Sequence, residues 1–171
     1  GVLDPLVMLV GEGPGADEDR TGLPFVGKAG QYLDKWLTAA SLDRGKNCFI
    51  GNVIKCRPPG NRDPLPDEIA ACSGYIDRQI ELINPKVVVT LGRFSMSRWF
   101  PTERISRIHG RPKRFGNIMV VPMYHPAAAL HQSSLRATIE ADMQKLPQIV
   151  AQIEAEADEY EDPDAEQMRL F

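Results

Sequence analysis

This chain has few cysteines, no long apolar run and no large excess of one charge. Three cysteines among 171 residues are too few, and odd in number, for a disulfide framework, which favours a reducing compartment. No apolar run approaches the roughly 18–20 residues that cross a membrane. The hydrophobic content of 43% is ordinary, and the length suffices for one domain with a sizeable core. We therefore expect one folded cytoplasmic domain, with no membrane partner.

The net charge of −3 hides an uneven distribution. Residues 154–171 hold eight acids and one base, a net charge of −7, so the rest of the chain carries +4. A mildly basic body is compatible with a polyanionic partner, although it does not demand one. The composition predicts a folded domain over residues 1–157 and an acidic flexible tail over residues 158–171.

Apolar runs ended by glycine, asparagine or proline alternate with segments of helical periodicity. The β-branched runs predict four strands, at Leu6–Val10, Phe49–Ile50, Val87–Leu91 and Ile118–Val121. The periodic segments predict helices at Lys28–Ala40, Pro66–Ile83, Arg93–Phe100 and from Ser134 to about Ala157. Such alternation is typical of an α/β fold with a parallel sheet covered on both faces.

Groups suited to holding a flat polar ring follow these strands. Phe25 lies in a loop bounded by glycine and proline, Asn52 follows the second strand, and His125 follows the fourth. Loops at the carboxyl ends of parallel strands converge on one edge of the sheet, so we expect the three to share a cleft. An aromatic face, an amide and a hydrogen-bond donor would suit a base such as uracil. Singly, they could also be a core plug, a turn cap and an ordinary loop histidine.

The turn GEGPG at residues 11–15 differs from the dinucleotide-binding fingerprint. That fingerprint needs the spacing G-x-G-x-x-G, whereas this turn reads G-x-G-x-G and contains a proline. Asp17 and Glu18 follow at once and would repel a pyrophosphate, so we expect no nucleotide cofactor. The turn is better suited to bring backbone N–H groups, Glu12 and Glu18 close to a ligand or a water.

Two further groups of residues suggest a phosphate contact and a metal site. Arg57 and Arg62 flank a Pro-Pro-Gly-Asn loop that suits phosphate contact. Cys56 and Cys72 lie sixteen residues apart, one after a strand and one in a helix, and two thiols are half of a typical iron–sulfur site.

Taken together, the motifs resemble the uracil-DNA glycosylase superfamily, specifically its family 4 iron–sulfur enzymes. The segments GEGPGADEDRTGLPFVGKAG and GNVIKCRPPGNRDPLPDE and the His-Pro loop stand in the family's order, and the likeness runs from Leu6 to about Leu146. The resemblance implies a three-layer α/β/α sandwich around a four-stranded parallel sheet. It also implies a monomeric bacterial or archaeal base-excision-repair enzyme, associated with the nucleoid, that flips uracil out of DNA and hydrolyses its glycosidic bond.

The resemblance also assigns roles to single residues. It implies that uracil is bound by Gly13, Gly15, Phe25, Asn52 and His125. It implies that catalysis depends on Glu12, Gly13, Glu18, Asn61 and His125, with His125 stabilising charge on the departing uracil. From the resemblance and their loop positions, we expect DNA contacts from Lys55, Arg57, Arg62 and Leu130.

The chain departs from the family pattern in two places. The family holds a [4Fe–4S] cluster on four cysteines, of which Cys56 and Cys72 match the second pair. The first pair is expected upstream of Gly1, and the alternative is that the protein has lost its cluster. The His-Pro loop continues as Ala-Ala-Ala-Leu-His, without the usual aromatic residue and second leucine. Leu130 alone remains as the apolar wedge, which predicts less efficient base flipping or a preference for single strands.

The last five residues suggest a partner. Gln167, Leu170 and Phe171 match a Q-x-x-L-F peptide that resembles the segments with which bacterial proteins bind the DNA polymerase sliding clamp. At the end of an acidic linker, such a peptide would raise the local concentration of the enzyme at replicating DNA.

Two alternatives to a hydrolase stay open. One is a relative that captures uracil-DNA without turnover, but that class needs a basic, histidine-containing insertion for which the short run from Arg57 to Pro66 leaves no room. The other is a pseudo-enzyme that recruits partners through its tail, against which Phe25, Asn52 and His125 argue.

Overall fold

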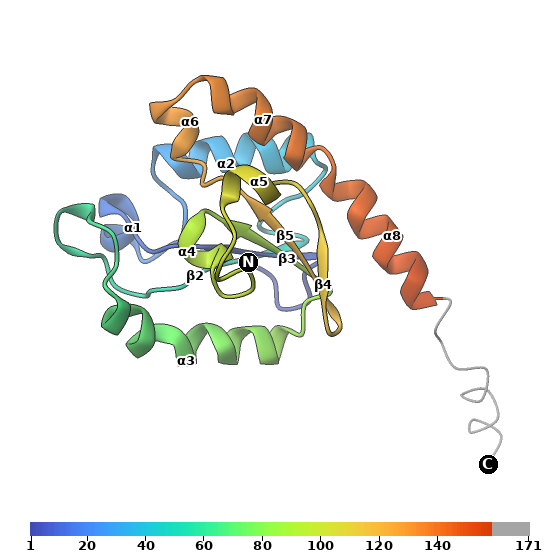
Figure 1. Ribbon diagram of the computed structural model, residues 1–171, viewed down its shortest axis with the longest axis horizontal. Coiled ribbons are helices and arrows are strands. Elements are labelled where there is room, and N and C mark those ends of the chain that lie inside the picture. The colour runs from blue at the N-terminus through green and yellow to red at the C-terminus, as the bar shows by residue number, and fades with distance from the viewer. Residues whose placement is uncertain (159–171) are drawn as a thin grey trace, which may run out of the picture.

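A central sheet of five strands organises the protein, in the order β2–β1–β3–β5–β4 (Figure 1). This computed structural model describes residues 1–158. The strands are β1 (Val7–Gly11), β2 (Cys48–Asn52), β3 (Val87–Leu91), β4 (Lys113–Phe115) and β5 (Ile118–Met123). Four of them, β2, β1, β3 and β5, are parallel, and β4 pairs with β5 in the antiparallel sense. The predicted α/β fold with four parallel strands is therefore confirmed.

The fifth strand, β4, was not predicted. It holds only three residues, two of them exposed cations, so it has no apolar run to reveal it. Its partner in the hairpin follows after Gly116-Asn117, where Gly116 takes a left-handed φ of 58°. A short cationic edge strand of this kind discourages pairing with other chains.

Helices connect the strands and cover both faces of the sheet. They are α1 (Ala16–Thr21), α2 (Lys28–Ala39), the 3-10 turn η1 (Pro59–Asn61), α3 (Pro66–Ile83), α4 (Arg93–Met96), α5 (Ile105–Ile108), α6 (Ala128–His131), α7 (Ser134–Met143) and α8 (Leu146–Asp158). The predicted helix 93–100 ends early, at Met96. The predicted terminal helix is two helices, because Pro147 lacks an N–H and is accommodated in the first turn of a new one. Within residues 1–158, no helix is long and apolar enough to span a membrane.

Alternate residues of the strands feed two separate cores. Leu9 and Val121 belong to a core shared with α2, α7 and α8, whereas Met8, Val10 and Val120 belong to a core shared with α3 and α4. Alternation along a strand places neighbouring side chains on opposite faces, so both faces of the sheet are buried. The three-layer arrangement predicted from the sequence is thus present, and it fixes the carboxyl ends of the strands along one edge.

We expect α3 to respond very differently to truncation on its two faces. Ile76 is fully buried beneath the sheet and Leu82 is 68% exposed on the same helix. Ile76→Ala should lower the free energy of unfolding by about 2–5 kcal/mol, because it leaves a cavity. Leu82→Ala is the matched control and should change it by less than about 0.5 kcal/mol. Urea denaturation would measure both, and equal losses would contradict the packing of α3.

Candidate active site

A cavity of about 410 Å³ opens where β1, β2 and β5 end. Its walls come from the loops after these strands, from α1 and α2, and from the turn η1. The lining residues are Glu12, Gly13, Pro14, Gly15, Glu18, Phe25, Ala29, Ile54, Pro58, Asn61, Arg62, His125, Ala127 and His131. Most of the predicted uracil-binding and catalytic residues therefore do meet in one place, at the carboxyl edge of the sheet, as expected for an open α/β sheet.

Phe25 is held unusually close to the backbone around it. Its own φ is 53°, in the left-handed region, and its side chain is only 5% exposed. A Cβ on Gly11 would lie 2.6 Å from the phenyl ring, and a Cβ on Gly30 would lie 1.8 Å from the Phe25 carbonyl oxygen. Only glycine fits at either position. The ring centroid lies 5.5 Å from that of His125, so the two rings form adjoining walls of the cavity.

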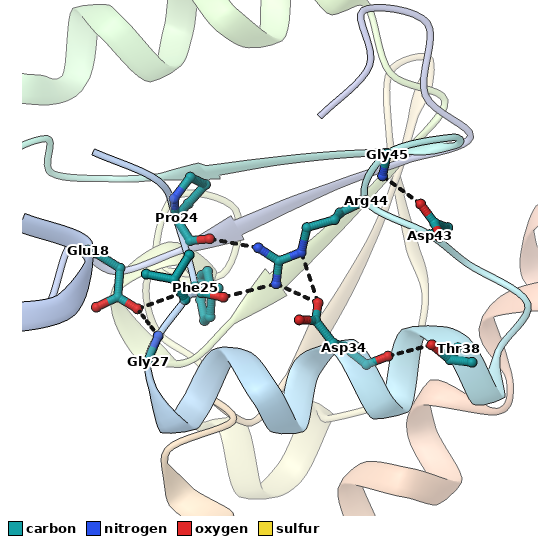
Figure 2. Close-up of polar contacts among 10 residues, drawn as sticks. Glu18, Pro24, Phe25, Gly27, Asp34, Thr38, Asp43, Arg44 and Gly45 are labelled. Atoms are coloured by element: carbon teal, nitrogen blue, oxygen red, sulfur yellow. Dashed lines mark hydrogen bonds and ion pairs between the residues drawn. The ribbon is translucent and has the colours of Figure 1, made fainter. Parts of the chain in front are cut away.

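Glu18 holds one side of the loop that carries Phe25 (Figure 2). Its Oε1 accepts hydrogen bonds from the backbone N–H groups of Val26 (2.9 Å) and Gly27 (2.8 Å), and its Oε2 accepts one from Gly15 (3.1 Å). Burial opposes ionisation, but the backbone donors prevail and lower the pKa of Glu18 below its ordinary value. The carboxylate is thus engaged in shaping two loops.

Arg44 holds the other side of the same loop. Its guanidinium donates to the carbonyl oxygens of Pro24 (2.8 Å) and Phe25 (2.9 Å), and its Nε donates to Asp34 on α2 at 2.8 Å (Figure 2). This role of Arg44 was not predicted, since the residue lies nineteen positions beyond Phe25 in an ordinary connection between α2 and β2. Only the folded chain brings the two together.

His125 is a neutral imidazole with a defined tautomer. The backbone N–H of Ala127 donates to its Nδ1 at 3.1 Å, and an N–H can donate only to an unprotonated nitrogen, so the ring proton sits on Nε2. Burial lowers the pKa of His125 to about 4, and the Glu18 carboxylate only partly opposes this. At neutral pH the residue therefore offers an Nε2–H donor without a positive charge.

Asn52 lies under this site rather than in the wall of the main cavity. It is 9% exposed, and its Oδ1 is buried without a hydrogen-bond partner in the described residues. A Cβ on Gly11 would lie 2.5 Å from that oxygen, as close as it would lie to the Phe25 ring. Asn52 lines a second cavity of about 310 Å³, which shares Pro14, Glu18 and Ile54 with the first. An unpartnered buried amide oxygen is costly and points to a ligand.

The remaining predicted catalytic residues line the main cavity. Burial, supported by the nearby Asp63 carboxylate and opposed by Arg93, raises the pKa of Glu12. Asn61 accepts a hydrogen bond from Arg57 Nε at 2.6 Å. A Cβ on Gly13 would lie 2.5 Å from the side chain of Ile54, which follows β2, so the turn can approach Ile54 this closely only with glycine there.

The residues predicted to contact DNA differ in how exposed they are and in which contacts their side chains already make. Leu130 on α6 is 39% exposed, as a wedge must be. The Arg62 guanidinium makes two hydrogen bonds to Glu68, at 2.9 and 2.7 Å. The Lys55 ammonium donates to the Asn52 carbonyl and to Gln79, both at 2.8 Å, and burial lowers the pKa of Lys55. Their contacts with DNA stay predictions.

The two candidate cluster ligands lie near one another. The Lys55 N–H donates to Cys72 Sγ at 3.4 Å, and Cys56 is the next residue along the chain. Cys56 is exposed and Cys72 half-buried. In residues 1–158, however, no three His, Cys, Asp or Glu side chains are grouped so as to hold a metal.

The fold and the cleft define an α/β protein with a base-sized polar site at the carboxyl edge of its sheet. A family model described as the uracil DNA glycosylase superfamily matches residues 1–147. The chain belongs to this superfamily, which confirms the family inferred from the motifs.

Three relatives show how far the similarity extends. The type-4 uracil-DNA glycosylase of Sulfurisphaera tokodaii is 45% identical over 84% of this chain and 69% of its own length. That of Archaeoglobus fulgidus is 43% identical over 84% of this chain and 76% of its own length. That of Thermotoga maritima is 42% identical over 85% of this chain and 78% of its own length.

We expect His125 to titrate near pH 4, which ¹H–¹⁵N NMR of the imidazole would show. The unfolded residue gains its proton near pH 6.5, so the unfolded state binds more protons between about pH 6.5 and pH 4. The stability contributed by neutral His125 is complete above that window and is lost as the pH falls through it. The difference in unfolding free energy between wild type and His125→Ala should shrink accordingly. A native pKa near 6.5 would contradict this.

We expect Arg44 to position Phe25 through its carbonyl contacts. Arg44→Ala should release the 24–25 backbone and increase amide hydrogen exchange at Val26 and Gly27, and Arg44→Lys should restore only part of the protection because lysine lacks the planar fork. Lys46→Ala, on the same connection, is the control. Unchanged exchange in Arg44→Ala would show that Glu18 holds the loop alone.

Proposed function

We propose that the protein removes uracil from DNA by hydrolysing its N-glycosidic bond and leaves an abasic site. The observation that supports the proposal most is that Phe25 and His125 lie side by side and that Asn52, whose Oδ1 has no hydrogen-bond partner within residues 1–158, lies close to the same ring beside Gly11. The type-4 uracil-DNA glycosylases to which the chain is similar support the substrate.

Recognition would depend on Phe25 and Asn52. A base inside the duplex is out of reach, so the nucleotide must rotate out at a cost of a few kcal/mol. Uracil then stacks on the Phe25 ring, worth roughly 1–3 kcal/mol. Asn52 Oδ1 would accept the N3–H of uracil, and its amide N–H would donate to O4. Cytosine has no N3–H and carries an amino group instead of O4, so with the amide in this orientation it would leave both amide groups unsatisfied.

Bond breaking would depend on His125. As the C1′–N1 bond breaks, its electron pair passes to the base, and negative charge develops on the uracil oxygens. The Nε2–H of His125 would donate to O2 without transferring its proton, an electrostatic stabilisation of the leaving group. A water oxygen bonds to C1′ and its proton passes to solvent. Glu12 and Asn61 line the cavity where that water would approach, whereas the Glu18 oxygens already accept backbone N–H groups.

Two further proposals, a metal cluster and a clamp-binding peptide, go beyond what residues 1–158 contain. Cys56 and Cys72 could supply two of the four thiolates of a [4Fe–4S] cluster, but the described residues do not by themselves fit such a cluster, and no step above passes through one. The predicted clamp-binding peptide, with Gln167, Leu170 and Phe171, lies outside the described residues and stays a proposal, as do the domain boundary at 157 and the monomeric state.

We expect His125→Ala and Asn52→Ala each to lose activity while the fold survives. Removing one donor to a developing anion typically costs about 10²–10³ in rate, and a loss of this size is expected for His125→Ala. Uracil release from a single-uracil oligonucleotide would measure it, with circular dichroism as the check of folding. Wild-type turnover in either folded variant would disprove the site. A stable protein–DNA adduct without repeated release would instead favour the capture protein.

A further inference from the structure

A basic segment flanks the site on the side away from β2. Residues 104–114 hold five cations and no acid, and all five are exposed: Arg104, Arg107, Arg111, Lys113 and Arg114. The segment begins at the start of α5 and ends in the edge strand β4, and in Figure 1 the chain passes from one to the other along the sheet edge that β4 forms.

The two cations in β4 already have local partners. Arg114 pairs with Glu156 of α8, and the Lys113 ammonium lies 5.3 Å from the centre of the Phe115 ring. In contrast, Arg104, Arg107 and Arg111 make no side-chain hydrogen bond or ion pair within residues 1–158. We call these three arginines the basic strip. The protection of an edge strand by cations accounts for the β4 pair, but the strip lies before β4 and needs another explanation.

The apolar residues of α5 determine which way the arginines of the basic strip face. Ile105 and Ile108 lie one helical turn apart and pack against the core beneath the sheet. Arg104, the extended residue just before α5, and Arg107 within it each come one position before these isoleucines, and both are exposed. The isoleucines therefore face the core, and the two arginines face solvent.

The strip is anchored beside the His-Pro loop. His109 Nδ1 lies 2.6 Å from Oδ2 of the buried Asp142, which also accepts a hydrogen bond from Lys145 at 2.9 Å. The Gly110 N–H donates to the Pro122 carbonyl at 2.8 Å, near the end of β5. The His109 ring centroid lies 5.0 Å from that of Tyr124, the residue before His125. Arg107 and Arg111 thus flank a segment fixed against the strand that carries the catalytic loop.

We propose that the basic strip binds backbone phosphates of the DNA that flanks the flipped nucleotide. This rests on the proposed function. Unpaired, exposed guanidinium groups complement a polyanion, and each phosphate that they neutralise releases counterions. The strip would contribute affinity and orientation without reading sequence, and it would hold DNA beside a His-Pro loop that keeps Leu130 as its only leucine.

The test removes the three charges and compares the result with an equal change elsewhere. The strip variant is Arg104→Gln, Arg107→Gln, Arg111→Gln. The control is Lys35→Gln, Lys46→Gln, Lys86→Gln; these are exposed cations, two of which precede the amino ends of β2 and β3, away from the site. Binding of uracil-free duplex DNA is measured against salt concentration, and uracil release is measured at limiting and saturating DNA.

The strip variant should bind uracil-free DNA more weakly than the control, and its slope of log K against log salt should shrink by about 1 for each phosphate that it no longer neutralises. Its KM for uracil-DNA should rise while kcat at saturating DNA stays near wild type. Equal slopes in the two triple variants would overturn the proposal. If wild type releases no uracil, the proposed function fails, but the binding comparison still decides the role of the strip.

Discussion

The backbone conformation of Phe25 is the constraint from which the rest of the site follows. A left-handed φ costs a non-glycine residue roughly 1–2 kcal/mol, and it persists only where the surroundings impose it. Here the Glu18 carboxylate accepts hydrogen bonds from N–H groups of the loop, and the Arg44 guanidinium donates to carbonyl groups of the loop. Because hydrogen bonds hold the loop from both sides, the phenyl ring has a fixed position beside His125 in the wall of the cavity.

Close approach of backbone to side chain makes that arrangement possible. Gly11 ends β1 where both the Phe25 ring and the Asn52 amide lie within 3 Å of any added Cβ. Gly30 does the same on α2, against the Phe25 carbonyl. These glycines of the sequence motif therefore leave room for the Phe25 ring, the Asn52 amide and the Phe25 carbonyl group, and they do not form a phosphate-binding loop.

Burial sets the chemistry of the titratable groups in the cleft. It favours the neutral form of His125 and raises the pKa of Glu12, so two residues of unlike type are both driven towards their uncharged states. Glu18 lies in the same cleft but keeps its charge, since backbone N–H groups surround it. Burial without compensating donors therefore makes His125 a neutral hydrogen-bond donor, whereas the backbone N–H groups around Glu18 keep it an anion that holds two loops.

Sequence alone determined the four parallel strands, the helix Pro66–Ile83 and the meeting of Phe25 and His125 at one edge, because these depend on local periodicity and on a general property of parallel sheets. Asn52, expected in the same cleft, instead lines the adjoining cavity. Sequence alone missed β4, which has no apolar pattern, and it missed the contacts of Arg44 with the Phe25 loop and of His109 with Asp142, whose partners are distant in the chain. Nor could the sequence reveal that the Lys55 ammonium contacts the Asn52 carbonyl and Gln79, and the DNA contact expected of Lys55 stays a prediction. Periodicity is written into neighbouring residues, but hydrogen-bond partners and burial depend on which distant segments the fold brings together.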